Sequence, residues 1–278
     1  MIPLDRFDKW SSQLNQSARQ FLNDVEYERY QSILEHERLR QLKALLERPI
    51  AHFSPVNEVF FRARWAEALG AIHESGDLTL LEVGSGDADM VPHMMAHNYP
   101  HSRYICANMN RILTKRLRAK TKYLKVELMV IEEDAVNITD YLQPESVDII
   151  AFQHAVNDVI QAILCDQNGI DTVYTDWMEM LPLMIHIMQK EFKQDTLEAH
   201  VKPGFLSLLE KLCQVLKPGG FMVMSHYMFQ LDLDWGYPPV LWENYIPITR
   251  EWITELPNLT EKSISGFDPQ WWLFYQKI

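Results

Sequence analysis

Two glycines that directly follow a short apolar run are the residues best placed to bind a small ligand. The run Thr79–Val83 is too short for a helix and stops at Gly84, so it predicts a buried strand. Gly84 and Gly86 allow a sharp turn with positive φ and a close approach of the backbone to a ligand. A helix is expected next, with Asp87 or Asp89 as its cap. Such a strand–turn–helix unit directs free backbone N–H groups toward a small anionic group.

The spacing of this turn separates three classes of cofactor site. A dinucleotide fingerprint has glycine at its first, third and sixth positions, and the sixth position here is Asp89. A phosphate-binding P-loop ends in Gly-Lys-Ser/Thr, and this turn contains no lysine. The pattern that remains is acidic-x-Gly-x-Gly, read from Glu82 to Gly86. It resembles motif I of the class I S-adenosylmethionine-dependent methyltransferases.

Short apolar runs alternate with helical segments after this turn. The alternation predicts an α/β fold with a doubly wound, mostly parallel sheet and right-handed crossovers. The last two runs flank residues 267–270 and predict a hairpin, which makes the final strand antiparallel. The expected strands are 79–83, 103–108, 126–131, 146–152, 221–224, 262–266 and 271–276.

The order of further motifs strengthens the resemblance, which covers about residues 78–278. The family has a polar residue after strand three, an acidic residue at the start of strand four, and a Leu-Lys-Pro-Gly-Gly turn before strand five. The resemblance therefore implies a seven-stranded, Rossmann-like methyltransferase sheet. The matching residues are Asp134-Ala135, Asp148, Leu216–Gly220 and the hairpin strand with Trp271–Tyr275.

Two positions depart from the family pattern. Asn108 stands where the family usually carries an Asp or Glu that holds the ribose hydroxyls, and Ala88 replaces the third glycine of motif I. An amide can accept one hydrogen bond and donate another. It nevertheless loses the stronger charge-assisted bond of a carboxylate.

The chain divides into a helical extension and a methyltransferase-like domain. Residues 1–76 are expected to form the extension, because 4–47 and 57–73 carry apolar residues at helical spacing. The extension could cap the active site or form an extra helical layer. The domain would span 77–278, with insertions at about 161–203 and 227–247.

The resemblance implies S-adenosylmethionine as cofactor and assigns residues to it. The glycines let the backbone approach its methionine half, Glu82 orients that turn and the ammonium group, and Asn108 meets the ribose. The acidic residue after strand three accepts the adenine amino group. The cofactor-binding residues would be Glu82, Gly84, Ser85, Gly86, Asn108, Met109, Asp134, Ala135 and Gln153.

Catalytic and substrate residues are expected at the same edge of the sheet. His154 follows the fourth strand and is the first candidate for a general base, with His226 as the alternative. Asn157 and Asp158 are read as caps of the next helix. The walls of a substrate pocket would come from the second insertion, through Tyr227, Trp235 and Tyr237.

No metal site is expected. His93, His97 and His101 recur every four residues, but Pro100 ends the helix before the last of them. The stripe of Met180, Met184 and Met188 is read as core, with an adaptable pocket or partner groove as the alternative.

The composition of the chain limits the partners and the location that can be expected for it. The net charge of −12 and pI near 5.3 argue against a general grip on nucleic acid. Three scattered cysteines, no signal pattern and no apolar stretch of about 18 residues predict a cytoplasmic protein away from the membrane.

The expected function is methyl transfer to an O, N or C atom of a small aromatic or amphipathic acceptor. A non-catalytic partner-binding protein and a protein or peptide methyltransferase are the alternatives, and a homodimer is left open. A nicotinamide oxidoreductase is disfavoured by Asp89 and Asn108.

Overall fold

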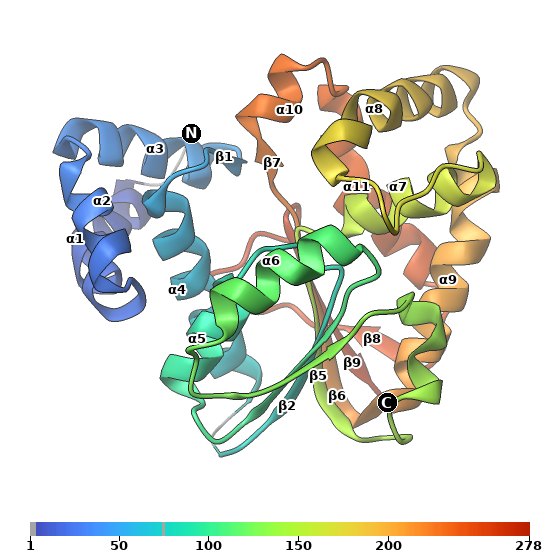
Figure 1. The fold of residues 1–278 in the computed structure, drawn as a ribbon, viewed down its shortest axis with the longest axis horizontal. Helices are drawn as coiled ribbons and strands as arrows, with labels where there is room; N and C mark the ends of the chain where they lie inside the picture. The colour runs from blue at the N-terminus through green and yellow to red at the C-terminus, as the bar shows by residue number, and fades with distance from the viewer. Residues whose placement is uncertain (1–3, 74–75) are drawn as a thin grey trace.

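The computed structural model describes residues 4–73 and 76–278 and has an α/β architecture around one large sheet (Figure 1). The seven strands lie in the order β4-β3-β2-β5-β6-β9-β8. Every neighbouring pair is parallel except β6–β9 and β9–β8. The strands are β2 Thr79–Val83, β3 Arg103–Ala107, β4 Glu127–Ile131, β5 Val147–Gln153, β6 Leu216–Ser225, β8 Leu259–Glu261 and β9 Trp272–Lys277. The doubly wound, mostly parallel fold class is thereby confirmed.

The central strands are apolar because they are buried on both faces. In β2, positions 80–83 are all buried, and β5 is buried at six of its seven positions. Parallel strands covered by helices have this continuous apolar character. The order of the strands reverses between β2 and β5, so the carboxyl ends of β2, β3 and β5 meet at the point where such sheets bind ligands.

The helices of the sheet domain follow the strands in regular alternation. Helix α5 comes after β2, α6 after β3, the short 3-10 helix η1 after β4, and α7 after β5. The first insertion forms α8, and the second forms β7, α10 and the start of α11. The bounds are α5 Met90–Asn98, α6 Arg111–Thr121, η1 Ala135–Asp140, α7 Val156–Gln167, α8 Trp177–Gln194, α9 Leu197–Val215, β7 Met228–Phe229, α10 Gln230–Asp234 and α11 Pro239–Ile253.

The described part of the N-terminal extension forms four helices and a short strand. The single helical segment expected over 4–47 is three helices, because Asn23 starts a new one with a capping box to Glu26. In Figure 1, α1–α3 gather on the side of the molecule opposite to α8, and β1 pairs in parallel with β7 of the second insertion. One hydrophobic core extends from Trp10 to Tyr275. The bounds are α1 Leu4–Phe21, α2 Asp24–Ser32, α3 Glu35–Glu47, β1 Ile50–Ala51 and α4 Pro55–Ile72.

Two expected turns differ from the structure. The Lys-Pro-Gly-Gly segment belongs to β6 as a bulge, with a register shift against β5 between Val147 and Ile149. Gly220 is needed there because an added Cβ would lie 2.7 Å from the carbonyl oxygen of Asp148. The first hairpin strand is 259–261 instead of 262–266. The backbone N–H groups of Trp271 and Trp272 donate to the carbonyl oxygen of Asp268, so a turn directly precedes β9.

Asp148 holds the start of its strand, as expected. One carboxylate oxygen accepts a hydrogen bond from the backbone N–H of Thr79 at 2.8 Å, and the other pairs with Nζ of Lys217 at 2.6 Å. The residue therefore joins β2, β5 and the bulge of β6.

Candidate functional site

A cavity of about 1040 Å³ lies at the carboxyl ends of β2, β3 and β5. Its lining comes from the motif I turn, the ends of β3 and β5, the loop before α8, the second insertion and the start of α4. Most of the sequence-predicted site residues line it. These are Gly84, Ser85, Gly86, Asn108, Met109, Asp134, Ala135, Gln153, His154, Tyr227 and Tyr237. The described residues Glu82, His226 and Trp235 do not line it.

The motif I turn has the backbone conformation that its glycines predict. Gly84 has φ of +66° and Gly86 has φ of +59°. A Cβ added to Gly84 would lie 3.3 Å from Cβ of Ala155, so the turn also packs closely on the start of α7. The hydroxyl of Ser85 lies 3.0 Å from Sγ of Cys106, which fixes the turn to β3 from below.

Glu82 lies beneath the turn and is fully buried. The hydroxyl of Tyr104 donates to its Oε2 at 2.6 Å, while Oε1 has no hydrogen-bond partner among the described residues. Burial raises the pKa of Glu82 to about 8, although the bond from Tyr104 acts in the opposite direction. Without a ligand, this carboxyl group is therefore largely protonated at neutral pH.

The raised pKa of Glu82 predicts a pH-dependent stability. The unfolded chain loses this proton near its ordinary pKa of 4.5, whereas the folded protein keeps it up to about pH 8. Stability from this group is therefore present at low pH and lost as the pH rises toward 8. Glu82→Gln removes the titration, so its free energy of unfolding relative to wild type should improve by about 2–4 kcal/mol between pH 5 and pH 8. Urea unfolding at the two pH values checks this, and a constant difference would refute it.

Asn108 holds the motif I turn through a bond that a carboxylate could not make. Its Nδ2 donates to the carbonyl oxygen of Gly86 at 2.7 Å, and the side chain is buried. An ionised Asp at this position has no hydrogen to donate. The departure from the family pattern therefore has a structural reason in this chain.

Asn108→Asp is expected to destabilise the protein although it restores the residue type usual in the family. A buried carboxylate would face the carbonyl of Gly86 without a donor between them. The expected loss in the free energy of unfolding is about 1–3 kcal/mol at pH 7. Asn108→Ser, which keeps a donor, serves as control. Equal stabilities of wild type and Asn108→Asp would contradict this reading of the bond.

Asp134 has a structural bond in addition to its place in the cavity lining. One carboxylate oxygen accepts from the backbone N–H of Val136 at 3.0 Å and caps η1. The capping alternative for this residue is therefore confirmed, and its role toward a ligand stays a prediction.

A loop of the first insertion is tied across the cofactor end of the cavity. Nδ2 of Asn110 donates to the carbonyl oxygens of Thr172 at 2.8 Å and Thr175 at 2.9 Å. Its Oδ1 caps α6 at Leu113. Sequence reasoning missed Asn110, although an Asn just before a helix is a recognisable cap signal.

The two candidate bases are both poor proton acceptors in this structure. Burial lowers the pKa of His154 to about 3 and that of His226 well below its ordinary value. His154 has φ of +56°, and its ring stacks on Tyr227 with the centroids 4.1 Å apart. His226 is buried behind it, outside the cavity lining. Packing, rather than basicity, accounts for these two rings.

The second insertion supplies part of the cavity wall. Tyr227 and Tyr237 are buried and line the cavity, whereas Trp235 is 44% exposed and packs at the surface beside Pro182 of α8. Trp235 therefore lies at the surface and not in the pocket where it was predicted, because the insertion turns at Gly236.

Two carboxylates in the cavity were missed as site residues. Asp158 and Asp232 both line it. Asp158 was read as a helix cap, but α7 starts after Ala155 without a side-chain cap bond. Burial and the charge of Asp232 raise the pKa of Asp158 to about 8, and burial raises that of Asp232 to about 6. The signal in the sequence was an Asp within the first turn of a helix at the ligand-binding edge.

The extension reaches the cavity through the start of α4. Phe53, Ser54, Asn57 and Glu58 belong to the lining. The ring of Phe53 stacks on Phe229 of the second insertion at 4.4 Å. The extension therefore lies beside the cavity, which is the position that a cap over the active site requires.

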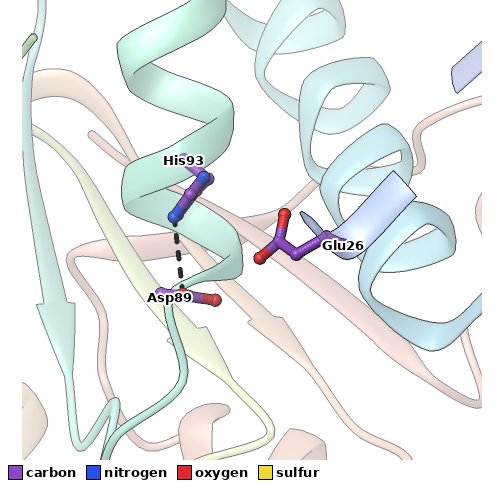
Figure 2. Close-up of side chains that lie close together, drawn as sticks. All are labelled: Glu26, Asp89 and His93. Atoms are coloured by element: carbon purple, nitrogen blue, oxygen red, sulfur yellow. Dashed lines mark ion pairs between the residues drawn. The ribbon is translucent and has the colours of Figure 1, made fainter. Parts of the chain in front are cut away.

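A partly buried charge cluster connects the extension to the motif I helix. Glu26, Asp89 and His93 lie with one ligand-type atom each within 4.8 Å of one another, and Figure 2 shows Glu26 facing the other two from α2. The guanidinium of Arg62 pairs with Glu26 at 3.0 Å and with Asp89 at 3.3 Å. Arg62 thereby supplies the positive charge that a metal ion would bring.

The predicted cap role of Asp89 is replaced by these contacts. It is the N-cap residue of α5 but makes no side-chain cap bond. Burial acts to raise the pKa of Asp89, but the bond from His93 and the charge of Arg62 outweigh it and lower that pKa to about 2.

The burial of side chains tests further predictions from the sequence. Met180, Met184 and Met188 are buried, which confirms the core reading of the methionine stripe. The three cysteines are free and buried. Among the described residues, no helix has the length and apolar character needed to cross a membrane.

Comparisons with known proteins support the fold. No protein-family model matches the sequence, and no curated protein is similar to it in sequence. The structure of an S-adenosylmethionine-dependent methyltransferase from Aquifex aeolicus aligns with a TM-score of 0.50 and 11% identity, over 78% of this chain and 89% of that one. The chain thus has the fold of the class I S-adenosylmethionine-dependent methyltransferases.

Two other solved structures align at lower TM-scores. The CurJ carbon methyltransferase gives 0.45 and 13% identity, over 98% of this chain and 69% of that one. An O-methyltransferase from Thermotoga maritima gives 0.43 and 10% identity, over 78% and 64%. The fold assignment rests on the first structure and on the strand order.

Proposed function

We propose that this protein transfers a methyl group from S-adenosylmethionine to a nitrogen, oxygen or carbon atom of a small acceptor. The observation that carries the proposal is one continuous cavity at the switch point of the sheet. One end of it is lined by the motif I turn and Asp134, and the other by Tyr227 and Tyr237. A methyl transferase needs a cofactor and an acceptor in one enclosed space.

The residues at the first end fit the cofactor. Gly84 and Gly86 keep their backbone open to a ligand at positive φ. Glu82, beneath the turn, has a buried carboxyl oxygen without a hydrogen-bond partner among the described residues, and a bound ammonium group nearby would favour its ionised form. Asn108 and Asp134 would meet the ribose and the adenine amino group, and Gln153 the methyl end of the cofactor.

When bound, the cofactor supplies a methyl group on a positively charged sulfur, so that an acceptor lone pair forms the new bond to carbon and the electrons of the broken bond stay on sulfur. The residues of this chain therefore contribute chiefly alignment and exclusion of water. The loop tied by Asn110 and the wall from the second insertion serve this enclosure.

A small acceptor fits the second end best. Its walls are built by Phe53, Tyr227, Phe229 and Tyr237, which suit an aromatic or amphipathic molecule. The acidic balance of the chain speaks against nucleic acid as substrate. The three free, buried cysteines are in keeping with a cytoplasmic location.

The proposal is tested by the release of S-adenosylhomocysteine from the cofactor with panels of small amines, phenols and carbon nucleophiles. We expect release above the acceptor-free background for at least one panel. If no panel raises the release although S-adenosylhomocysteine binds, the protein is not a small-molecule methyltransferase. A partner-binding role would then account for the fold.

A further inference from the structure

The acceptor end of the cavity is rich in hydrogen-bond acceptors that lack donors, and we infer that it binds a cationic amine as the methyl acceptor. This inference rests on the proposed function and narrows its acceptor to nitrogen. Three sets of residues carry it: buried amides with free carbonyl oxygens, two carboxylates, and an aromatic wall.

Three buried amides line the cavity with their oxygens unsatisfied. Gln153, Asn157 and Gln161 are 3%, 5% and 2% exposed. Their NH₂ groups donate to the hydroxyl of Tyr227 at 3.0 Å, to Oδ1 of Asp158 at 2.8 Å and to the hydroxyl of Tyr237 at 2.9 Å, respectively. Each carbonyl oxygen has no partner among the described residues. Buried acceptors of this kind are unfavourable unless a donor reaches them, so a ligand with several N–H groups is favoured.

Two carboxyl groups at this end of the cavity can become negatively charged when a cation binds. Asp158 comes from α7 and Asp232 from α10. Burial raises the pKa of both carboxyl groups above the ordinary value. A bound cation would stabilise both ionised forms. The only Lys or Arg side chains among the described lining residues are Arg116 and Lys120 of α6. Both are already paired, with Asp176 at 2.6 Å and Asp87 at 3.0 Å.

The aromatic wall suits a cation with an apolar body. Phe53 and Phe229 stack at 4.4 Å, and each leaves its other face uncovered by this pair. Tyr227, in contrast, is stacked between Phe61 and His154 and presents its edge. Ring faces attract an ammonium group within about 6 Å of their centroid. Such rings also hold the hydrocarbon part of an arylalkylamine.

The same residues can remove the proton that an ammonium must lose before it reacts. The ammonium nitrogen gives one proton to the Asp158 carboxylate, which leaves a neutral amine with a free lone pair and a neutral carboxylic acid. That lone pair then forms the N–C bond while the bond between the methyl carbon and sulfur breaks and leaves its electron pair on sulfur, and the product is a methylated ammonium. With its pKa near 8, Asp158 is a far better proton acceptor than His154, whose pKa is about 3.

Calorimetric titration of the protein saturated with S-adenosylhomocysteine tests the inference. The probes are benzylamine and 2-phenylethylamine, with 2-phenylethanol as the neutral analogue and 3-phenylpropionate as the anionic one. We expect an amine to bind about tenfold or more tightly than the alcohol, and the acid not to bind. Since Asp158 holds a proton in the free site, amine binding should release protons, seen as a heat that depends on the buffer.

Asp158→Asn and Asp232→Asn should each weaken amine binding about tenfold while leaving the affinity for 2-phenylethanol unchanged. Asp166→Asn is the matched control, because Asp166 lines the same cavity but is exposed. The inference is overturned if amine and alcohol bind equally, if no amine binds, or if neither Asp158→Asn nor Asp232→Asn weakens the amine. Unchanged binding of S-adenosylhomocysteine in these cases would show that the proposed function itself survives.

Discussion

Gly84→Asp is expected to abolish measurable binding of S-adenosylhomocysteine, with a loss of about a hundredfold or more. Two effects act together at this position. The residue has φ of +66°, a conformation that costs a side chain of this kind about 1–2 kcal/mol. Its Cβ would lie 3.3 Å from Ala155, so the added carboxylate has to turn into the cavity lining where the cofactor backbone contacts are expected. The strain lowers the stability of the turn, whereas the carboxylate in the space of the cofactor accounts for the loss of binding, for which a hundredfold change represents roughly 2.7 kcal/mol.

Gly219→Asp separates the effect on binding from the effect on folding. Gly219 also has positive φ, of +75°, and its added Cβ would meet nothing within 4 Å. It lies in the bulge of β6, outside the cavity lining. The control variant should share the backbone strain and the added charge but bind S-adenosylhomocysteine like wild type. Wild-type affinity in Gly84→Asp would mean that the motif I turn does not hold the cofactor.

Arg62→Met is expected to lower the free energy of unfolding by about 3–5 kcal/mol. The guanidinium is fully buried and also donates to the carbonyl oxygen of Phe21 at 2.5 Å. Its removal leaves the carboxylates of Glu26 and Asp89, 16% and 14% exposed, without their common partner. A buried charge that loses its partner is strongly destabilising, whereas an exposed pair contributes little.

Urea unfolding of three variants checks this expectation. Lys43→Met removes an exposed pair with Glu47 and should change stability by less than about 0.5 kcal/mol. Adding Glu26→Gln to Arg62→Met should recover part of the loss, because one unpaired charge fewer remains. A loss below about 1 kcal/mol in Arg62→Met would show that water, rather than Arg62, satisfies this cluster.

The sequence predicted the sheet well because its signals are local. Thr79–Val83 was found with its observed bounds, since a short apolar run that ends at glycine has few other solutions. The hairpin strand at 259–261 was placed three residues too late. Its bounds depend on the pairing with β9, and pairing is not encoded in the short run itself.

The sequence predicted the lining of the cofactor end, but it predicted the acceptor end only in part, through Tyr227 and Tyr237. Motif I and Asp134 carry recognisable local patterns, and both line the cavity. Asp158 and Asp232 belong to segments far apart in the chain, and only the fold brings them into one cavity. The weak basicity of His154 likewise follows from burial, which a residue type does not reveal.

Calorimetric titration of the purified protein with S-adenosylhomocysteine, with NADH as control, tests the central claim most directly. We predict micromolar binding of S-adenosylhomocysteine and none of NADH, with about tenfold weaker binding in Asp134→Ala. The absence of binding to S-adenosylhomocysteine, or tighter binding of NADH, would contradict the assignment of this cavity to methyl transfer.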